Sequence, residues 1–338
     1  MKLLMNANRT KTAIQISLST EIDNLINQGR NILILTHINP DGDAIGSQLA
    51  MASFVRSKGK NVFLVRDDEI PKNLQFLAGA EDIPLFGNLP DSLKIDTAII
   101  LECPHLHRAG KAEQLLNDAV KIINIDHHHD NDNYGDIKWV DSSISSVGEM
   151  LYELFENLNF HISESVAEQL YTAILTDTGR FRFKSTSKRT MEIAGNLVEA
   201  GASPSHITDL VYYNQEPSSI RLLGKVLNAI EFHFSDRLCL ISVTQNMLAA
   251  AKATKEDTEG LIDYTLYSNT TEIGLMLKEV DSSTTKVSLR SREKIDISKI
   301  AAQFGGGGHF NASGCQINKD IETAKSELLK AIGEELSD

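Results

Sequence analysis

Four potential metal ligands stand in a row at Asp126-His127-His128-His129, directly after the apolar segment Lys121–Ile125. That segment is rich in isoleucine and predicts a buried parallel strand. Open α/β sheets bind their ligands at the carboxyl ends of such strands. Unpaired polar groups at a buried position are costly, so the run favours a functional site. Taken alone, it would fit a polar loop equally well.

A second corner follows the apolar segment Asn31–Thr36 and carries His37, Asp41 and Asp43. The intervening Asn-Pro-Asp-Gly is turn-forming, and the helical spacing of apolar residues in 44–58 predicts a crossover helix. In isolation this corner would more often be a helix cap and a turn. It lacks the later oxygen ligands that a calcium-binding EF-hand loop needs.

Two further acids occupy comparable positions. Glu102 follows the strand-like residues 96–101, and Asp177 follows the apolar helical residues 166–175. One such acid is usually a solvated surface residue, but four corners in one βαβ pattern predict a shared site. Oxygen-rich sets with imidazole and without thiolate suit Mn²⁺ or Mg²⁺, and so many acids would repel one another unless two cations lay among them. The residues alone therefore predict a two-metal hydrolase.

The elements that must position these residues form an α/β fold. We expect an N-terminal doubly wound, mostly parallel sheet, a helical linker, and a smaller C-terminal α/β domain with a mixed sheet. The predicted boundaries are a catalytic metal-binding domain at 1–186, the linker at 187–230 and a substrate-binding domain at 231–338. Within the first domain, the alternating cations and aromatics of Arg180–Lys184 predict a half-buried strand.

Composition sets bounds on the function. The chain of 338 residues is long enough for two cores. Its three cysteines have neither metal-ligand nor disulfide-framework spacing, which predicts a cytoplasmic protein. No signal peptide or membrane span is expected. The net charge of −13 argues against broad binding of long duplex DNA, but it is compatible with a short anionic substrate.

The C-terminal part adds two phosphate-binding candidates. Four glycines, Gly305–Gly308, precede His309; glycine lets the backbone approach a ligand, and successive N–H groups can bind an anion. A flexible loop is the plainer interpretation of this run. Arg290 could hold a terminal phosphate through its planar fork. Arg108, just past Glu102, could reach a phosphate from the other side, or be an ordinary surface arginine.

Together these motifs resemble the DHH phosphoesterase superfamily. The shared order is His-x-x-x-Asp-x-Asp from His37, an acid after a middle strand, Asp-His-His, and Thr-Asp-Thr-Gly from Thr176. Ser288-Leu-Arg290-Ser and the Gly-rich segment before His309 resemble the DHH-associated domain of the NrnA-like oligoribonuclease and pAp phosphatase branch. The resemblance covers nearly the whole chain. One departure is Glu102, where the family usually has aspartate, and its extra methylene bears on metal spacing and rate.

The resemblance implies a phosphoesterase that hydrolyses short oligonucleotides (nanoRNA) to mononucleotides, or 3′-phosphoadenosine 5′-phosphate (pAp) to AMP. It implies two Mn²⁺ ions, with Mg²⁺ as an alternative, held by His37, Asp41, Asp43, Glu102, His127 and Asp177. It assigns His128 to the phosphate or the leaving group, and Asp126 to orienting the imidazoles. The substrate-binding residues it implies are Arg290, Gly306, Gly307, His309 and Arg108.

Other interpretations stay open at this point. The substrate could be a linear or cyclic dinucleotide, and an impaired Glu102 site could leave a nucleotide-binding sensor. A RecJ-like exonuclease fits less well because the chain is short and acidic, and a pyrophosphatase would not be expected to carry Arg290 with the Gly-rich loop. The expected partners are short RNA or DNA oligonucleotides or a nucleotide bisphosphate, with no membrane. A homodimer is as compatible with the sequence as a monomer.

Overall fold

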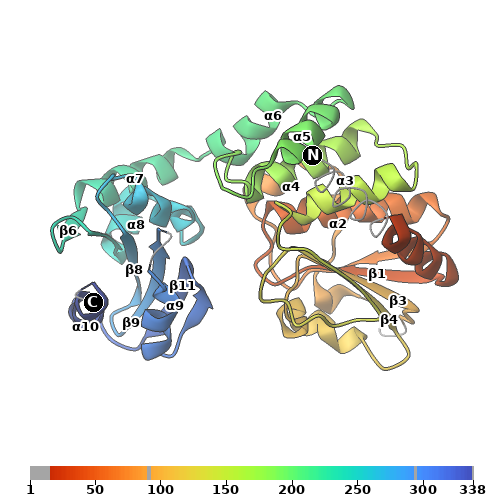
Figure 1. Ribbon diagram of the computed structural model, residues 1–338. Helices are drawn as coiled ribbons and strands as arrows, with labels where there is room; N and C mark the ends of the chain where they lie inside the picture. The colour runs from red at the N-terminus through yellow and green to blue at the C-terminus, as the bar shows by residue number, and fades with distance from the viewer. Residues whose placement is uncertain (1–15, 90–92, 293–294, 337–338) are drawn as a thin grey trace, which may run out of the picture. The chain divides into compact units, whose positions relative to one another are not determined.

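A computed structural model describes residues 16–89, 93–292 and 295–336 of the chain (Figure 1). They form two compact units, Met1–Asn214 and Gln215–Asp338. The first fifteen residues, where no signal peptide is expected, lie outside the described part. No helix in the described part is both long and apolar enough to cross a membrane.

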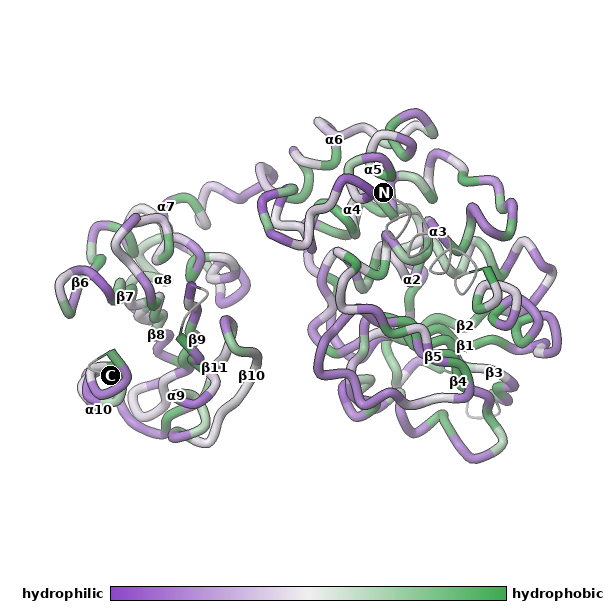
Figure 2. Tube along the Cα trace, viewed as in Figure 1, coloured by the Kyte–Doolittle hydropathy of each residue, from purple (hydrophilic) through white to green (hydrophobic). Residues whose placement is uncertain are grey.

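The N-terminal unit is built on a five-stranded parallel sheet in the order β2-β1-β3-β4-β5. Its strands are β1 (Asn31–Leu35), β2 (Asn61–Leu64), β3 (Thr97–Leu101), β4 (Lys121–Asp126) and β5 (Ile137–Val140). Alternate residues of the central strands enter two different cores, because successive side chains of a strand point to opposite faces. Ile32 and Ile34 pack in one core, whereas Leu33 and Leu35 pack in the other. Both faces are therefore covered, and the apolar strands are the green centre of this unit in Figure 2.

Helices cover one face of this sheet (Figure 1). They are α2 (Gly42–Ser57), α3 (Val147–Asn157) and α4 (Glu164–Asp177), followed by α5 (Lys188–Glu199) and α6 (Pro204–Thr208); residues 16–28 are also helical. The opposite core contains Ala109 and Ala112 of the 3-10 segment η4 (Leu106–Leu115). Glycines let the helices approach closely: a Cβ on Gly46 of α2 would lie 2.4 Å from the Gln169 carbonyl oxygen of α4.

The C-terminal unit has a mixed sheet in the order β10-β11-β9-β8-β7-β6, in which only β7 and β8 are parallel. The strands are β6 (Glu231–His233), β7 (Leu238–Val243), β8 (Ile273–Asp281), β9 (Thr284–Ser291), β10 (Gly307–His309) and β11 (Ala312–Ile317). One face packs against α9 (Ile297–Gln303) and α10 (Ile321–Glu335). The other packs against α7 (Pro217–Asn228), α8 (Gln245–Ala251) and the 3-10 helix η7 (Leu261–Leu266).

These two sheets confirm the predicted fold class. The predicted strand at Arg180–Lys184 is wrong, because these residues form turns. Gly179, Arg180 and Phe181 all have φ between 55° and 66°, a left-handed conformation that a strand cannot contain. The division at 186 and 230 stays a prediction, and the boundary between the two compact units falls within the predicted linker.

Candidate metal centre

The predicted ligands gather where the strand order reverses. From β1 the chain moves outward to β2 and then returns to the other side of β1 as β3. Such a switch point is where open α/β sheets bind ligands. His37, Asp41 and Asp43 follow β1, Glu102 follows β3, and Asp126 ends β4. Parallel strands bring their carboxyl ends to one edge, so segments far apart in sequence meet there.

Glu102 is buried at this edge and has an uncommon backbone conformation. Its backbone adopts φ 55°, which is uncommon for a residue other than glycine. Its Oε2 atom is buried and has no hydrogen-bond partner among the described residues. Burial raises the pKa of Glu102 well above its ordinary value, and the nearby Asp43 charge adds to the rise. Backbone strain and an unpaired buried oxygen at one residue are typical of a functional site.

His127 lies between two acids. Its Nε2 atom is 3.2 Å from Glu102 Oε1 and 3.4 Å from Asp177 Oδ2, while its Nδ1 atom is 3.2 Å from the Ile144 carbonyl oxygen. Burial lowers the pKa of His127, but the charges of Glu102 and Asp177 outweigh it and raise the pKa to about 11. The carbonyl favours a proton on Nδ1, so Nε2 is the atom that would bind a metal.

Within the described residues, two sets of donor atoms lie within 4.8 Å of one another: Asp43, His127 and Asp177, and Glu102, His127 and His128. His127 belongs to both sets, so the two are contiguous. The donors are carboxylate oxygens and imidazole nitrogens, which fit Mn²⁺ or Mg²⁺ chemically. The unpaired Oε2 of Glu102 adds a buried oxygen that a cation would satisfy. This part of the predicted site is therefore assembled in a form that fits divalent cations.

Asp43 has a second, structural task. Its Oδ2 accepts a hydrogen bond from Val147 N (2.6 Å), and its Oδ1 accepts one from Gly148 N (2.8 Å). Ser47 Oγ also donates to Oδ1 at 2.9 Å. Asp43 is fully buried, and it satisfies the free N–H groups and the positive end of α3. Ser146 is the N-cap residue of α3, and nothing in the sequence indicates that Asp43 completes this cap.

His37 and Asp41 lie at the edge of the site. His37 Nδ1 is 2.7 Å from the Ile38 carbonyl oxygen, and Nε2 is 4.0 Å from Asp41 Oδ2. Asp41 caps α2 by accepting from Ala44 N through Oδ1. Neither residue belongs to a close donor set among the described residues. Their role as ligands stays a prediction.

Asp126 holds the imidazole of His128. Its Oδ1 lies 2.8 Å from His128 Nδ1, and its Oδ2 accepts from Asn131 Nδ2 at 2.6 Å. These contacts lower the pKa of Asp126 despite its burial. Asn131 is a residue that sequence reasoning missed: it is buried and also donates to Asn124. Its place between two aspartates in Asp-Asn-Asp gives no pattern that would single it out.

The predicted substrate-binding residues divide between the two units. In the first, Ile38 N donates to the Arg108 carbonyl oxygen at 2.7 Å, which ties the Arg108 loop to the residues after β1. The Arg108 guanidinium makes no hydrogen bond or ion pair with another described residue. In the second, Arg290 on β9 pairs with Ala312, which pairs in turn with His309. The side chain of His309 lies outside what the structure describes.

Two glycines of the Gly-rich segment differ in the space around them. A Cβ on Gly306 would lie 2.2 Å from the Gly314 carbonyl oxygen, so packing alone requires glycine there. A Cβ on Gly307 would meet nothing within 4 Å. Packing therefore does not require glycine at position 307, and the open space is compatible with approach of a ligand to the backbone. Substrate binding at both positions stays a prediction.

The stability of the metal-free protein should fall as pH rises. Burial raises the pKa of Asp177 from 3.8 to about 8, and that of His127 rises from 6.5 to about 11. A group whose pKa is higher in the folded protein than in the unfolded chain contributes its full stabilisation of the fold below the unfolded pKa. It loses this contribution as the pH rises through the folded pKa. The melting temperature in EDTA should therefore decline between about pH 4 and 8 and continue to decline above it. Added Mn²⁺ should displace these protons and reverse the trend. A melting temperature in EDTA that rises over this range would contradict the view that Asp177 and His127 hold protons in the metal-free protein.

Comparison with known proteins bears on this site. Residues 31–174 match the DHH family, N-terminal domain, and residues 242–338 match the DHHA1 domain. The chain is 32% identical to the bifunctional oligoribonuclease and PAP phosphatase NrnA of Thermus thermophilus, over 90% of each protein. It is 28% identical to the protein of the same name from Bacillus subtilis, over 89% of this chain and 93% of that one.

Solved structures share the fold. An exopolyphosphatase-related protein from Bacteroides fragilis superposes with a TM-score of 0.88 and 28% identity, covering 95% of this chain and 96% of that one. A manganese-bound RecJ exonuclease superposes with a TM-score of 0.55 at 14% identity, covering 94% of each chain. At that identity the second match shows a common fold.

Proposed function

Since the chain belongs to the DHH family, we propose that it is a metal-dependent phosphoesterase that hydrolyses short oligoribonucleotides to mononucleotides and pAp to AMP. The observation that carries the proposal is the set of carboxylates and imidazoles around Glu102, whose Oε2 is buried without a partner. The relatives from Thermus thermophilus and Bacillus subtilis, both named oligoribonuclease and PAP phosphatase, support the substrate class.

We assign the metal ligands as the motifs imply. His37, Asp41 and Glu102 would hold one Mn²⁺, and Asp43, Glu102, His127 and Asp177 would hold the other. Bound there, the cations would supply an acidified water and neutralise charge on the phosphate. The close set of Asp43, His127 and Asp177 supports the second assignment. Mg²⁺ fits the same donors, and Mn²⁺ is favoured because imidazoles are among them.

The protein's own groups would orient the substrate and handle its protons. Asp126 holds His128 through Nδ1, so Nε2 is the ring atom that we assign to a phosphate oxygen or to the leaving group. Arg108 lies beside the site and could pair with a second phosphate oxygen. Arg290, Gly306, Gly307 and His309 would recognise the far end of the substrate. Three free, buried cysteines support a reducing compartment such as the cytoplasm.

Metal add-back tests this function. The protein is stripped with EDTA, and phosphate release from pAp and mononucleotide release from a dinucleotide are followed as Mn²⁺ or Mg²⁺ is restored. We expect no turnover without metal and full recovery with Mn²⁺. Nucleotide binding without turnover under every metal condition would overturn the proposal and indicate a sensor.

Glu102→Asp should retain turnover within about tenfold of the parent protein, whereas Glu102→Gln should lose it. Aspartate adopts positive φ more readily than most residues, so the backbone at φ 55° should accept it. Glutamine keeps the length but removes the charge that a bridging ligand needs. The measurement is kcat and KM for pAp in saturating Mn²⁺, and loss of activity in Glu102→Asp would contradict the bridging assignment.

A further inference from the structure

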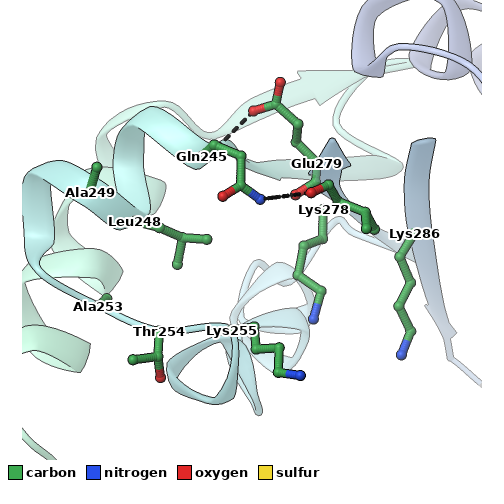
Figure 3. A pocket seen from close by; sticks show the side chains of 10 residues that line it. Gln245, Leu248, Ala249, Ala253, Thr254, Lys255, Lys278, Glu279 and Lys286 are labelled. Carbon is green, nitrogen blue, oxygen red and sulfur yellow. Dashed lines mark hydrogen bonds between the residues drawn. The ribbon is translucent and has the colours of Figure 1, made fainter. Parts of the chain in front are cut away.

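Three lysines of the C-terminal unit point into one pocket (Figure 3). Lys255, Lys278 and Lys286 line a hollow of about 590 Å³. Its other walls come from α8 and the segment after it, and they combine apolar and polar side chains such as Leu248 and Thr254. This volume is in the range of small-ligand sites.

Two of the lysines lie directly opposite each other on neighbouring strands, so their charges repel. Lys278 on β8 and Lys286 on β9 are direct cross-strand partners in an antiparallel pair, so their side chains leave the same face of the sheet. Like charges directly opposite destabilise a sheet. Burial lowers the pKa of Lys278, and Lys286 lowers it further.

Nearby acids offset the charge of this cluster only in part: Glu259 and Glu256 raise the pKa of Lys278, but burial and the neighbouring lysines outweigh them. The Glu279 carboxylate accepts from Gln245 N at 2.7 Å and turns away from the lysine amino groups in Figure 3. Lys255 has an exposed pairing with Glu256 at 3.8 Å. Lys278 Nζ donates to Thr258 Oγ1 at 3.1 Å, a neutral group.

Lys286 is the lysine of this cluster whose charge is best placed to bind a ligand. Its amino group makes no hydrogen bond or ion pair with another described residue. The pocket therefore offers its cationic donors to an anion.

The lysine pocket shares a strand face with Arg290. Lys286, Ser288 and Arg290 are alternate residues of β9, so they point to one side of the sheet. Arg290 Nε lies 3.9 Å from Asp263 of η7, on the face that α8 also covers. Four residues of extended strand span about 13 Å. A chain that carries a phosphate on every nucleotide could contact both positions.

We propose that the lysine pocket binds a further phosphate of an oligonucleotide that also contacts Arg290, and so favours substrates long enough to reach both positions. The inference rests on the proposed function. It assigns to the C-terminal unit a second phosphate-binding position, formed by Lys255, Lys278 and Lys286. A mononucleotide bisphosphate is too short to occupy both positions.

The test compares two substrates in wild type and in Lys286→Gln, a change at an exposed residue. The KM for a five-nucleotide RNA, divided by the KM for pAp, should rise about tenfold, as for loss of one charge-assisted hydrogen bond. The dependence of log KM on log salt for the RNA should fall by about 0.7, the value per phosphate contact of a single strand. Lys278→Met, which keeps the apolar stem, should act in the same direction.

Lys330→Gln is the matched control, because it removes the same charge from exposed α10, which packs on the opposite face of the sheet. It should leave the KM ratio unchanged. An unchanged ratio and salt slope in both pocket variants, with turnover of both substrates intact, would overturn the pocket alone. Absence of turnover of both substrates in the unmodified protein would overturn the proposed function and this inference with it.

Discussion

Asp177→Asn should lower kcat for short oligonucleotides and pAp by at least about a thousandfold, while the N-terminal unit stays folded. Asp177 ends α4, and its side chain is 25% exposed, so the amide can occupy the same space. Its close contact is His127 Nε2 at 3.4 Å, which a metal ligand set would replace. The substitution removes a charged oxygen ligand without removing an apolar contact.

The measurement is steady-state turnover in saturating Mn²⁺ together with thermal unfolding in EDTA. Glu164→Gln, an exposed change in the first turn of the same helix, is the control and should retain full activity. The metal-free melting temperature of Asp177→Asn should equal or exceed that of the parent, because a partly enclosed carboxyl beside the Asp43 charge becomes a neutral amide. Full activity in Asp177→Asn would exclude it as a metal ligand.

Asp43→Ala should abolish activity and also destabilise the N-terminal unit by about 2–4 kcal/mol. The alanine leaves Val147 N and Gly148 N at the start of α3 without their acceptor. Both residues are buried, and leaving a buried donor without an acceptor costs free energy. Asp43→Asn should be less destabilising, since the amide keeps one acceptor oxygen.

Trp139 allows the stability of the N-terminal unit to be measured separately. It is the only tryptophan of the chain, and it is buried in β5 of the N-terminal sheet. Urea unfolding followed by tryptophan fluorescence therefore reports on the N-terminal unit. Asp177→Asn and Asp43→Ala should share the loss of activity and differ in the urea midpoint. Equal midpoints would contradict the capping role of Asp43.

Where potential ligands follow a strand end, the sequence predicts that they lie close together, and their role as ligands stays a prediction. One rule covers Glu102, Asp126 and His127: polar residues at the end of a buried parallel strand lie at a shared edge. The structure brings Asp43 and His127, which follow β1 and β4, together with Asp177. Asp177 comes from a helix end, and its place follows from the close packing of α4 on α2 at Gly46.

Features set by long-range contacts could not be predicted in this way. The bonds from α3 to Asp43 join residues more than 100 positions apart, and no local pattern encodes them. The left-handed backbone of Glu102, Arg180 and Phe181 is imposed by the surrounding fold, since none of these residues prefers it. The lysine pocket depends on the register of β8 against β9, which sequence periodicity does not fix.

The most direct test of the central claim is a length series of single-stranded RNA, from two to about 25 nucleotides, with pAp beside it. Mononucleotide or phosphate release is measured with Mn²⁺ and with EDTA, and Asp177→Asn serves as the blank. We predict Mn²⁺-dependent turnover of pAp and of RNAs up to about five nucleotides, which falls for longer strands and is absent in the blank. Turnover of the longest strand alone, or equal turnover in EDTA, would contradict the account.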